Sequence, residues 1–122
     1  MSNVLLIDKK IKEFNKKIIV SGDKSISIRW VLLASQTIGK SKAYNLLMSE
    51  DVIAALQAIK RLGIKVSIHK NYCEIYGKGI NNFRYKNGLI INAKNSGTLG
   101  RLILGLLVKS PKKIKIIGDQ SL

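Results

Sequence analysis

The chain has 122 residues, a length that suits one domain, and its 46% hydrophobic content excludes a compositionally disordered protein. It carries 22 Lys and Arg residues against 7 Asp and Glu residues, a formal net charge of +15, which favours anionic partners but equally fits a lysine-rich surface. The single cysteine, Cys73, excludes an internal disulfide, and no apolar run reaches the length of a signal peptide core or a membrane span, so we expect a soluble cytoplasmic protein.

The first third of the chain predicts a strand, a helix and a second strand. Residues 17–20 are expected to end a strand, and residues 25–37 to form a helix that Gly39 ends. This helix is apolar nearly all round, which predicts burial on every side and a core position for Trp30. A short strand is expected over residues 41–47.

The middle of the chain predicts a helix followed by a hairpin. Residues 49–51 (Ser-Glu-Asp) are typical of a helix start, because a hydroxyl caps the first turn and acids favour its positive end. We interpret the two acids in this way rather than as a catalytic pair. The helix is expected to stop at Gly63, and strands over 64–68 and 72–76 are expected to pair, with Cys73 in the core.

The last part of the chain predicts a strand, a helix and a strand after a loop over residues 78–88. The strands are expected over 89–91 and 114–117. Between them, residues 95–98 open a second helix that is apolar all round and that Pro111 ends.

A short repeat suggests how these elements are organised. Residues 24–29 (KSISIR) lie 72 positions before residues 96–101 (SGTLGR), and in each segment small polar residues open an apolar helix that carries an arginine one turn in. The element order predicts an α/β (α+β) fold built from βαβαββ units, with about one and a half units present. The two apolar helices require more cover than this length supplies, which indicates a piece of a larger protein or an oligomer.

Two segments could bind an anion. In the first, Lys24 and Arg29 follow a turn at the start of a helix, where free backbone N–H groups and the helix dipole attract negative charge, and Ser25 shares a helix face with Arg29. Asp23 separates Gly22 from Lys24, so the Walker A phosphate loop is excluded. An ordinary turn and cap explains this segment alone equally well.

The second segment opens the later helix. Gly97 lets a ligand approach the backbone, Asn95 and Thr98 offer hydrogen-bonding groups, and Arg101 adds charge. Two such segments related by a repeat could converge on one small polyanion. The sequence contains no metal-ligand spacing, so no metal site is expected.

Four segments together resemble the EPSP synthases (3-phosphoshikimate 1-carboxyvinyltransferases). Residues 21–29 (SGDKSISIR) resemble the family's proline-glycine-(aspartate/serine)-lysine-serine motif, and residues 45–52 (NLLMSEDV) are similar to its NLLxSDD segment. Residues 95–101 (NSGTLGR) are similar to its GN(A/S)GTxxR loop, and residues 118–122 (GDQSL) to its GDxSL. The resemblance covers roughly residues 17–122 in the correct order.

The resemblance implies an enzyme of the shikimate pathway, which makes aromatic amino acids. Such a transferase moves the enolpyruvyl group of phosphoenolpyruvate to the 5-hydroxyl of shikimate 3-phosphate, passes through a tetrahedral intermediate, and uses no metal or organic cofactor. The family enzyme has two lobes of three βαβαββ units each. Residues 1–20 would pair with the other lobe, about 21–78 would form the first unit, and about 88–122 would begin the second. We therefore expect residues 1–20 to be exposed, disordered or swapped between chains.

The resemblance also assigns roles to site residues. Lys24 would be catalytic and contact phosphoenolpyruvate and shikimate 3-phosphate, and Ser25 and Arg29 would hold shikimate 3-phosphate. The phosphoenolpyruvate and glyphosate side would be lined by Asn95, Gly97, Thr98 and Arg101. The chain alone is expected to be inactive, with the remainder of the enzyme or a second chain required.

Four positions depart from the family pattern. Ser21 replaces a proline, Ile28 a histidine or asparagine, Lys94 a glycine, and Gly100 a methionine or similar residue. Lys94 adds charge beside the second anion-binding segment and could change its affinity.

Two alternatives remain open. The sister enolpyruvyl transferase, which acts on UDP-N-acetylglucosamine, has Lys-Asn where this chain has Lys24 and Ser25. A small basic nucleic-acid-binding module would explain the charge. It is not expected, however, because the lysines are dispersed along the sequence and aromatic residues make up only 6%.

Overall fold

The computed structural model describes residues 4, 6–10, 13 and 15–122, and it confirms the α/β fold class. The elements in chain order are α1 (Lys24–Gln36), β1 (Ile38–Tyr44), α2 (Glu50–Arg61), β2 (Lys65–Ile68), β3 (Tyr72–Lys78), β4 (Leu89–Asn92), α3 (Gly97–Leu107) and β5 (Ile114–Ile117).

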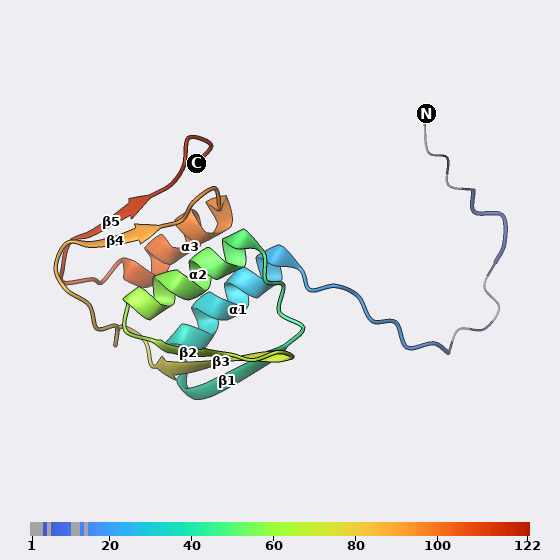
Figure 1. Ribbon diagram of the computed structural model, residues 1–122, viewed down its shortest axis with the longest axis horizontal. Helices are drawn as coiled ribbons and strands as arrows, with labels where there is room; N and C mark the ends of the chain where they lie inside the picture. The colour runs from blue at the N-terminus through green and yellow to red at the C-terminus, as the bar shows by residue number, and fades with distance from the viewer. Residues whose placement is uncertain (1–3, 5, 11–12, 14) are drawn as a thin grey trace.

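The fold has three layers, with the helices between two sheets (Figure 1). One sheet has the order β1-β3-β2 and is antiparallel throughout. The other pairs β4 with β5 in parallel, and α3 makes the crossover that a parallel pair requires. Helix α1 packs against β3 and α2 packs against β4, so the core lies on both sides of the helix layer.

All three helices run in the same direction (Figure 1). Their first turns lie at one end of the layer, where the chain arrives from residues 15–23, and their last turns lie at the other end. We call these the N-terminal end and the C-terminal end of the helix layer. Aligned helix dipoles make the first end a region of positive potential and the second a region of negative potential.

Several predicted boundaries are wrong. Residues 17–20 form no strand and are exposed, because no neighbouring strand among the described residues pairs with them. Helix α1 ends at Gln36, with Thr37 as its cap, and Gly39 lies inside β1, which begins three residues earlier than predicted. The described residues before residue 21 are exposed as expected, while residues 1–3, 5, 11–12 and 14 lie outside the described residues.

The two apolar helices are not buried on every side. In α1, Ile26 and Leu33 are 67% and 66% exposed, and in α3 Leu104 is 58% exposed. Trp30 is half-buried at the edge of the core rather than inside it. The sheets and neighbouring helices cover only part of each helix surface, so the prediction of all-round burial from composition was wrong for the described chain.

The predicted hairpin is confirmed. Strands β2 and β3 pair antiparallel with Ile68 opposite Cys73, and the turn closes through a hydrogen bond from the His69 amide to the Tyr72 carbonyl (2.9 Å). Cys73 is in the core as predicted, and burial raises the pKa of its thiol. No helix among the described residues is long and apolar enough to span a bilayer.

Candidate functional site

The first predicted anion-binding segment forms the start of α1. Asp23 caps the helix by accepting a hydrogen bond from the Ile26 amide (2.6 Å), so the helix begins at Lys24, one residue earlier than predicted. Lys24 and Arg29 are exposed and Ser25 is half-buried. The fold therefore presents a lysine, a hydroxyl and an arginine to solvent near the positive end of a helix.

The segment over residues 45–48 holds this helix start in place. The hydroxyl of Ser27 accepts a hydrogen bond from the Leu47 amide (3.2 Å), and the Asn45 side chain donates to the Val20 carbonyl (2.8 Å). Gly22 is required here, since a Cβ at that position would lie 2.4 Å from the Asn45 carbonyl oxygen. Residues far from Lys24 in the sequence thus fix the backbone that carries it.

The second predicted segment forms the start of α3. Ser96 is buried and caps the helix by accepting from the Leu99 amide (3.2 Å). A hollow of about 310 Å³ lies beside it, and its lining includes Asn95, Gly97 and Arg101. Thr98 is half-buried in the first turn.

Two ion pairs connect the two segments through the start of α2. Lys24 Nζ lies 3.0 Å from Asp51 Oδ2, and Lys94 Nζ lies 2.7 Å from Glu50 Oε1. Glu50 and Asp51 lie in the first turn of α2, as predicted. The sequence did not reveal that these consecutive acids each bind a lysine from a different segment. The only signal for the second pair was Lys94 itself, which stands where the resemblance places a glycine.

The cap of α2 differs from the prediction. Ser49 is the N-cap residue, but its side chain makes no capping hydrogen bond, and its buried Oγ has no partner among the described residues. The start of α2 is therefore held by the ion pairs and packing rather than by a hydroxyl cap.

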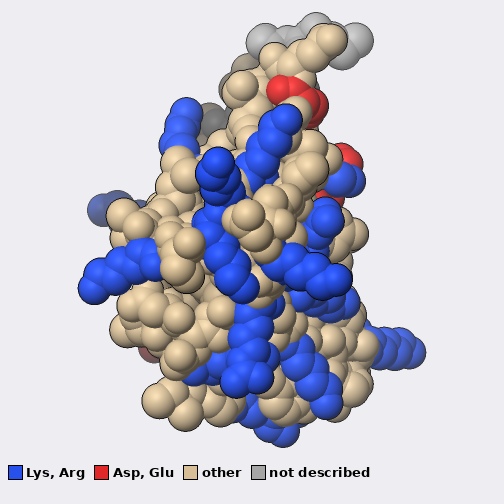
Figure 2. Space-filling view, turned by 90° about the vertical axis from the view of Figure 1, so that its left-hand side faces the viewer, with Lys and Arg blue, Asp and Glu red and all other residues tan. Residues whose placement is uncertain are grey.

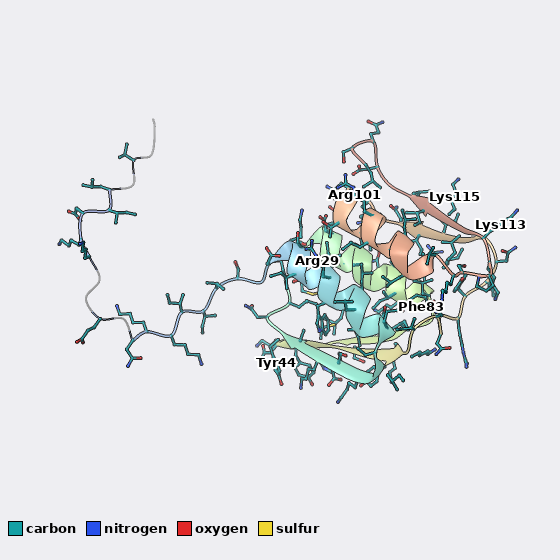
Figure 3. The ribbon with its side chains drawn as sticks, turned by 180° about the vertical axis from the view of Figure 1, so that it is seen from behind. Arg29, Tyr44, Phe83, Arg101, Lys113 and Lys115 are labelled. Carbon is teal, nitrogen blue, oxygen red and sulfur yellow. The ribbon has the colours of Figure 1, made fainter. Side chains whose placement is uncertain are left out.

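The repeat is offset at the helix starts. Arg29 lies six positions after its cap Asp23, whereas Arg101 lies five positions after its cap Ser96. One residue corresponds to about 100° around a helix, so the two arginines leave their helices in different directions. Figure 3 shows both arginines at the N-terminal end of the helix layer, with Lys113 and Lys115 at the opposite end.

Much of the basic charge lies away from this site. The face shown in Figure 2 is the C-terminal end of the helix layer, and Lys and Arg side chains gather across it. Two lysines near the helix C-termini bind backbone oxygens: Lys78 Nζ donates to the Gly63 carbonyl just after α2 (2.7 Å), and Lys112 Nζ donates to the Tyr85 carbonyl (2.8 Å). Cations at helix C-termini are expected from the dipole, so net charge alone does not locate the site.

No group of three or more His, Cys, Asp or Glu side chains suited to a metal ion occurs among the described residues. Around the three helix starts, four carboxylates are already engaged. Asp23 caps α1, Glu50 and Asp51 bind lysines, and Asp119 accepts hydrogen bonds from Ser121, which lower the pKa of its carboxyl. The cations and helix starts remain the groups that face an approaching ligand.

Comparisons with known proteins identify the family of the chain. The family model for EPSP synthase (3-phosphoshikimate 1-carboxyvinyltransferase) matches residues 8–122. The chain is 37% identical over 111 residues to the 3-phosphoshikimate 1-carboxyvinyltransferase of Bacillus cytotoxicus. The aligned region covers 91% of this chain and 26% of the relative. It is 41% identical over 105 residues to that of Streptococcus pyogenes serotype M2, covering 84% of this chain and 24% of the relative.

A solved structure gives the same result. EPSP synthase from Acinetobacter baumannii superposes with a TM-score of 0.74 at 32% identity, over 88% of this chain and 24% of that one. The chain thus spans about a quarter of the length of the relatives it matches. Family model, sequence relatives and solved structure agree, and the chain belongs to the EPSP synthase (3-phosphoshikimate 1-carboxyvinyltransferase) family.

Proposed function

We propose that this chain supplies part of the substrate site of a 3-phosphoshikimate 1-carboxyvinyltransferase, at the N-terminal end of its helix layer. The observation that carries this proposal is the joining of two basic helix starts by Glu50 and Asp51, which bind Lys94 and Lys24 respectively. Both substrates of the family reaction are small phosphorylated anions. Converging helix N-termini and cations are the groups that bind such anions in proteins.

The first helix start would hold shikimate 3-phosphate. Ser25 and Arg29 lie near the positive end of α1 and are accessible to a ligand. Lys24 would contact both substrates and act at the reacting centre. Its ion pair with Asp51 favours one position of the ammonium group, because the Asp51 side chain is only 12% exposed while that of Lys24 is 54% exposed. A fixed cation stabilises developing negative charge without reorganising.

The second helix start would hold phosphoenolpyruvate. Asn95, Gly97 and Arg101 line one hollow, and Thr98 lies in the same helical turn. In the family reaction the 5-hydroxyl oxygen loses its proton and adds to the enolpyruvyl carbon, while the methylene carbon gains a proton. Phosphate then leaves the tetrahedral intermediate as the new methyl carbon loses a proton, which restores the double bond. Clustered cations offset the repulsion between the two anionic reactants and hold them in attack geometry.

Proton transfer would depend on groups other than the four carboxylates around the helix starts. Protonation of the enolpyruvyl methylene and removal of the hydroxyl proton each require an acid or base with a free lone pair or proton. The described carboxylates at this end are engaged in a cap, in ion pairs or with Ser121. We therefore propose that this chain binds and orients the substrates, while the rest of the enzyme or a second chain supplies the acid and base.

The test is reconstitution. The chain would be assayed for phosphate release from phosphoenolpyruvate with shikimate 3-phosphate, alone and mixed with the remaining three quarters of the Bacillus cytotoxicus relative. We expect no turnover by the chain alone, and turnover in the mixture that falls by about 10²–10³-fold with Lys24→Met. Turnover that Lys24→Met leaves unchanged would contradict the proposed role of this end of the chain.

A further inference from the structure

Lys94 has an unusual backbone conformation. Among the described residues, three other than glycine have positive φ, and two of them, Asn45 and Asn81, are of a type that tolerates the left-handed region. Lys94 has φ 52°, and its long side chain cannot stabilise this conformation by bonding to the nearby backbone as a short asparagine side chain can. Strain of this kind costs on the order of 1 kcal/mol and persists where surrounding contacts enforce it, frequently at functional sites.

The contacts that enforce this conformation join Lys94 to three parts of the fold. Its amide donates to Asn92 Oδ1 (2.8 Å), which lies at the end of β4. Its carbonyl accepts from the Asp119 amide (2.9 Å), after β5. Its side chain reaches Glu50 in α2. The lysine is therefore held between the second anion-binding segment and the start of α2.

The two lysine–acid pairs at the start of α2 differ in the burial of the acid. The lysine side chains are 54% exposed at Lys24 and 38% exposed at Lys94, but the side chain of Asp51 is only 12% exposed and that of Glu50 is 65% exposed. An exposed pair contributes only about 0.2–1 kcal/mol, because water screens it and both side chains lose freedom. A phosphate or carboxylate that enters beside Lys94 can thus replace Glu50 as its partner at little cost, while Lys24 stays tethered to Asp51.

We infer that Lys94 is a further anion-binding residue of this chain, which Glu50 holds in place and yields to the phosphate or carboxylate group of a small phosphorylated ligand. This inference rests on the proposed function in one respect: both require that an anion binds at the N-terminal end of the helix layer. It concerns a residue that departs from the family's glycine, so it adds a charge that the family pattern lacks.

The experiment measures the dissociation constant of phosphoenolpyruvate for the full chain by amide NMR titration, with inorganic phosphate as a second probe. Lys94→Asn removes the charge and keeps a residue that tolerates positive φ, so this variant should fold. We expect it to bind about tenfold more weakly. Glu50→Gln releases Lys94, and we expect it to bind about threefold more tightly. Lys113→Gln, at the opposite end, is the matched control and should bind as the wild type does.

The double variant Glu50→Gln/Lys94→Asn decides between a direct and an indirect effect. If Glu50 acts through Lys94, the higher affinity of Glu50→Gln disappears in the Lys94→Asn background. A higher affinity that persists there would show simple repulsion between Glu50 and the ligand, and would overturn the inference. The inference would also be overturned by wild-type affinity in Lys94→Asn, or by the absence of ligand-induced shifts in both the wild type and Glu50→Gln.

Failure of this inference and failure of the proposed function give different results. Unchanged affinity in Lys94→Asn with intact shifts at Lys24, Ser25 and Arg29 removes only the role of Lys94. The expected pattern at Lys94 with no turnover in the reconstituted enzyme supports Lys94 as an anion-binding residue and counts against the proposed role of this end in the substrate site.

Discussion

The two ends of the helix layer use charge in opposite ways. At the N-terminal end, carboxylates bind lysines and fix them beside the helix starts, as in the Lys24–Asp51 pair. At the C-terminal end, lysines bind backbone carbonyls, as Lys78 does at Gly63. Residues 75–93 and 102–118 contain seven Lys and Arg and no Asp or Glu, yet the better candidate site is the end where the acids are. We therefore propose that an anion is recognised where the cations are held by carboxylates and not where cations are most abundant.

The largest expected difference between the ends is in catalysis. In the reconstituted enzyme, Lys24→Met should lower kcat/KM by about 10²–10³-fold, because it removes a positioned cation that stabilises charge in the transition state. Lys113→Met removes an equal charge at the opposite end and should leave kcat/KM unchanged. Steady-state phosphate release measures both. Equal losses in the two variants would mean that net charge, not position, controls the rate.

Stability should also depend on the end that is altered. Gly22→Ala places a Cβ 2.4 Å from the Asn45 carbonyl oxygen and 2.8 Å from the Leu47 amide nitrogen, so it should lower the free energy of unfolding by about 1–3 kcal/mol. Gly105→Ala in α3 meets nothing within 4 Å and should raise it by about 0.5–1 kcal/mol, since alanine favours the helix. Urea unfolding monitored by circular dichroism gives both values. A tolerated Gly22→Ala would show that the segment over 45–48 does not fix the start of α1.

The caps provide a finer comparison within the N-terminal end. Asp23→Ala removes a capping bond of 2.6 Å and should lower the free energy of unfolding by about 1 kcal/mol. Ser49→Ala removes a hydroxyl that makes no capping bond, so it should be neutral or slightly stabilising. The same urea titration compares the two variants. A loss in Ser49→Ala equal to that in Asp23→Ala would show that the α2 hydroxyl caps its helix in solution.

Glu74, on the three-stranded sheet away from both ends, should give the smallest effect, and a pH-dependent one. Its hydrogen bond with Lys40 lowers the pKa of its carboxyl below the ordinary 4.5, although burial opposes this shift. The resulting stability is fully present above the unfolded pKa and is lost as pH falls through the folded one. Glu74→Gln should therefore be less stable than the wild type at pH 7, and the difference should shrink below about pH 4.5. A difference that stays constant from pH 7 to pH 3 would exclude this linkage.

Sequence reasoning predicted most elements because their signals are local. The acids at the start of α2, the hairpin at His69–Tyr72 and the helix that follows Ser96 all depend on residues close together in the chain. The strand expected over 17–20 failed because a strand requires a partner, and its own apolar residues do not supply one.

In the candidate site, too, features that are local in the sequence could be predicted and contacts between distant residues could not. The residues of each anion-binding segment could be predicted, since each segment is continuous in the sequence. The bridge between Lys94 and Glu50 could not, because the two residues are 44 positions apart and only the folded chain brings them together. The direction of each arginine also depends on the helix cap, which differed by one residue from the repeat.

The most direct test follows backbone amides of the full chain during titration with shikimate 3-phosphate, with the C-terminal end of the helix layer as the internal control. We expect shifts concentrated at Lys24, Ser25 and Arg29, smaller ones at residues 94–101, and none at residues 109–115. Shifts concentrated at residues 109–115 instead, and lost in moderate salt, would show that the abundant cations attract the ligand and would contradict a site at the N-terminal end.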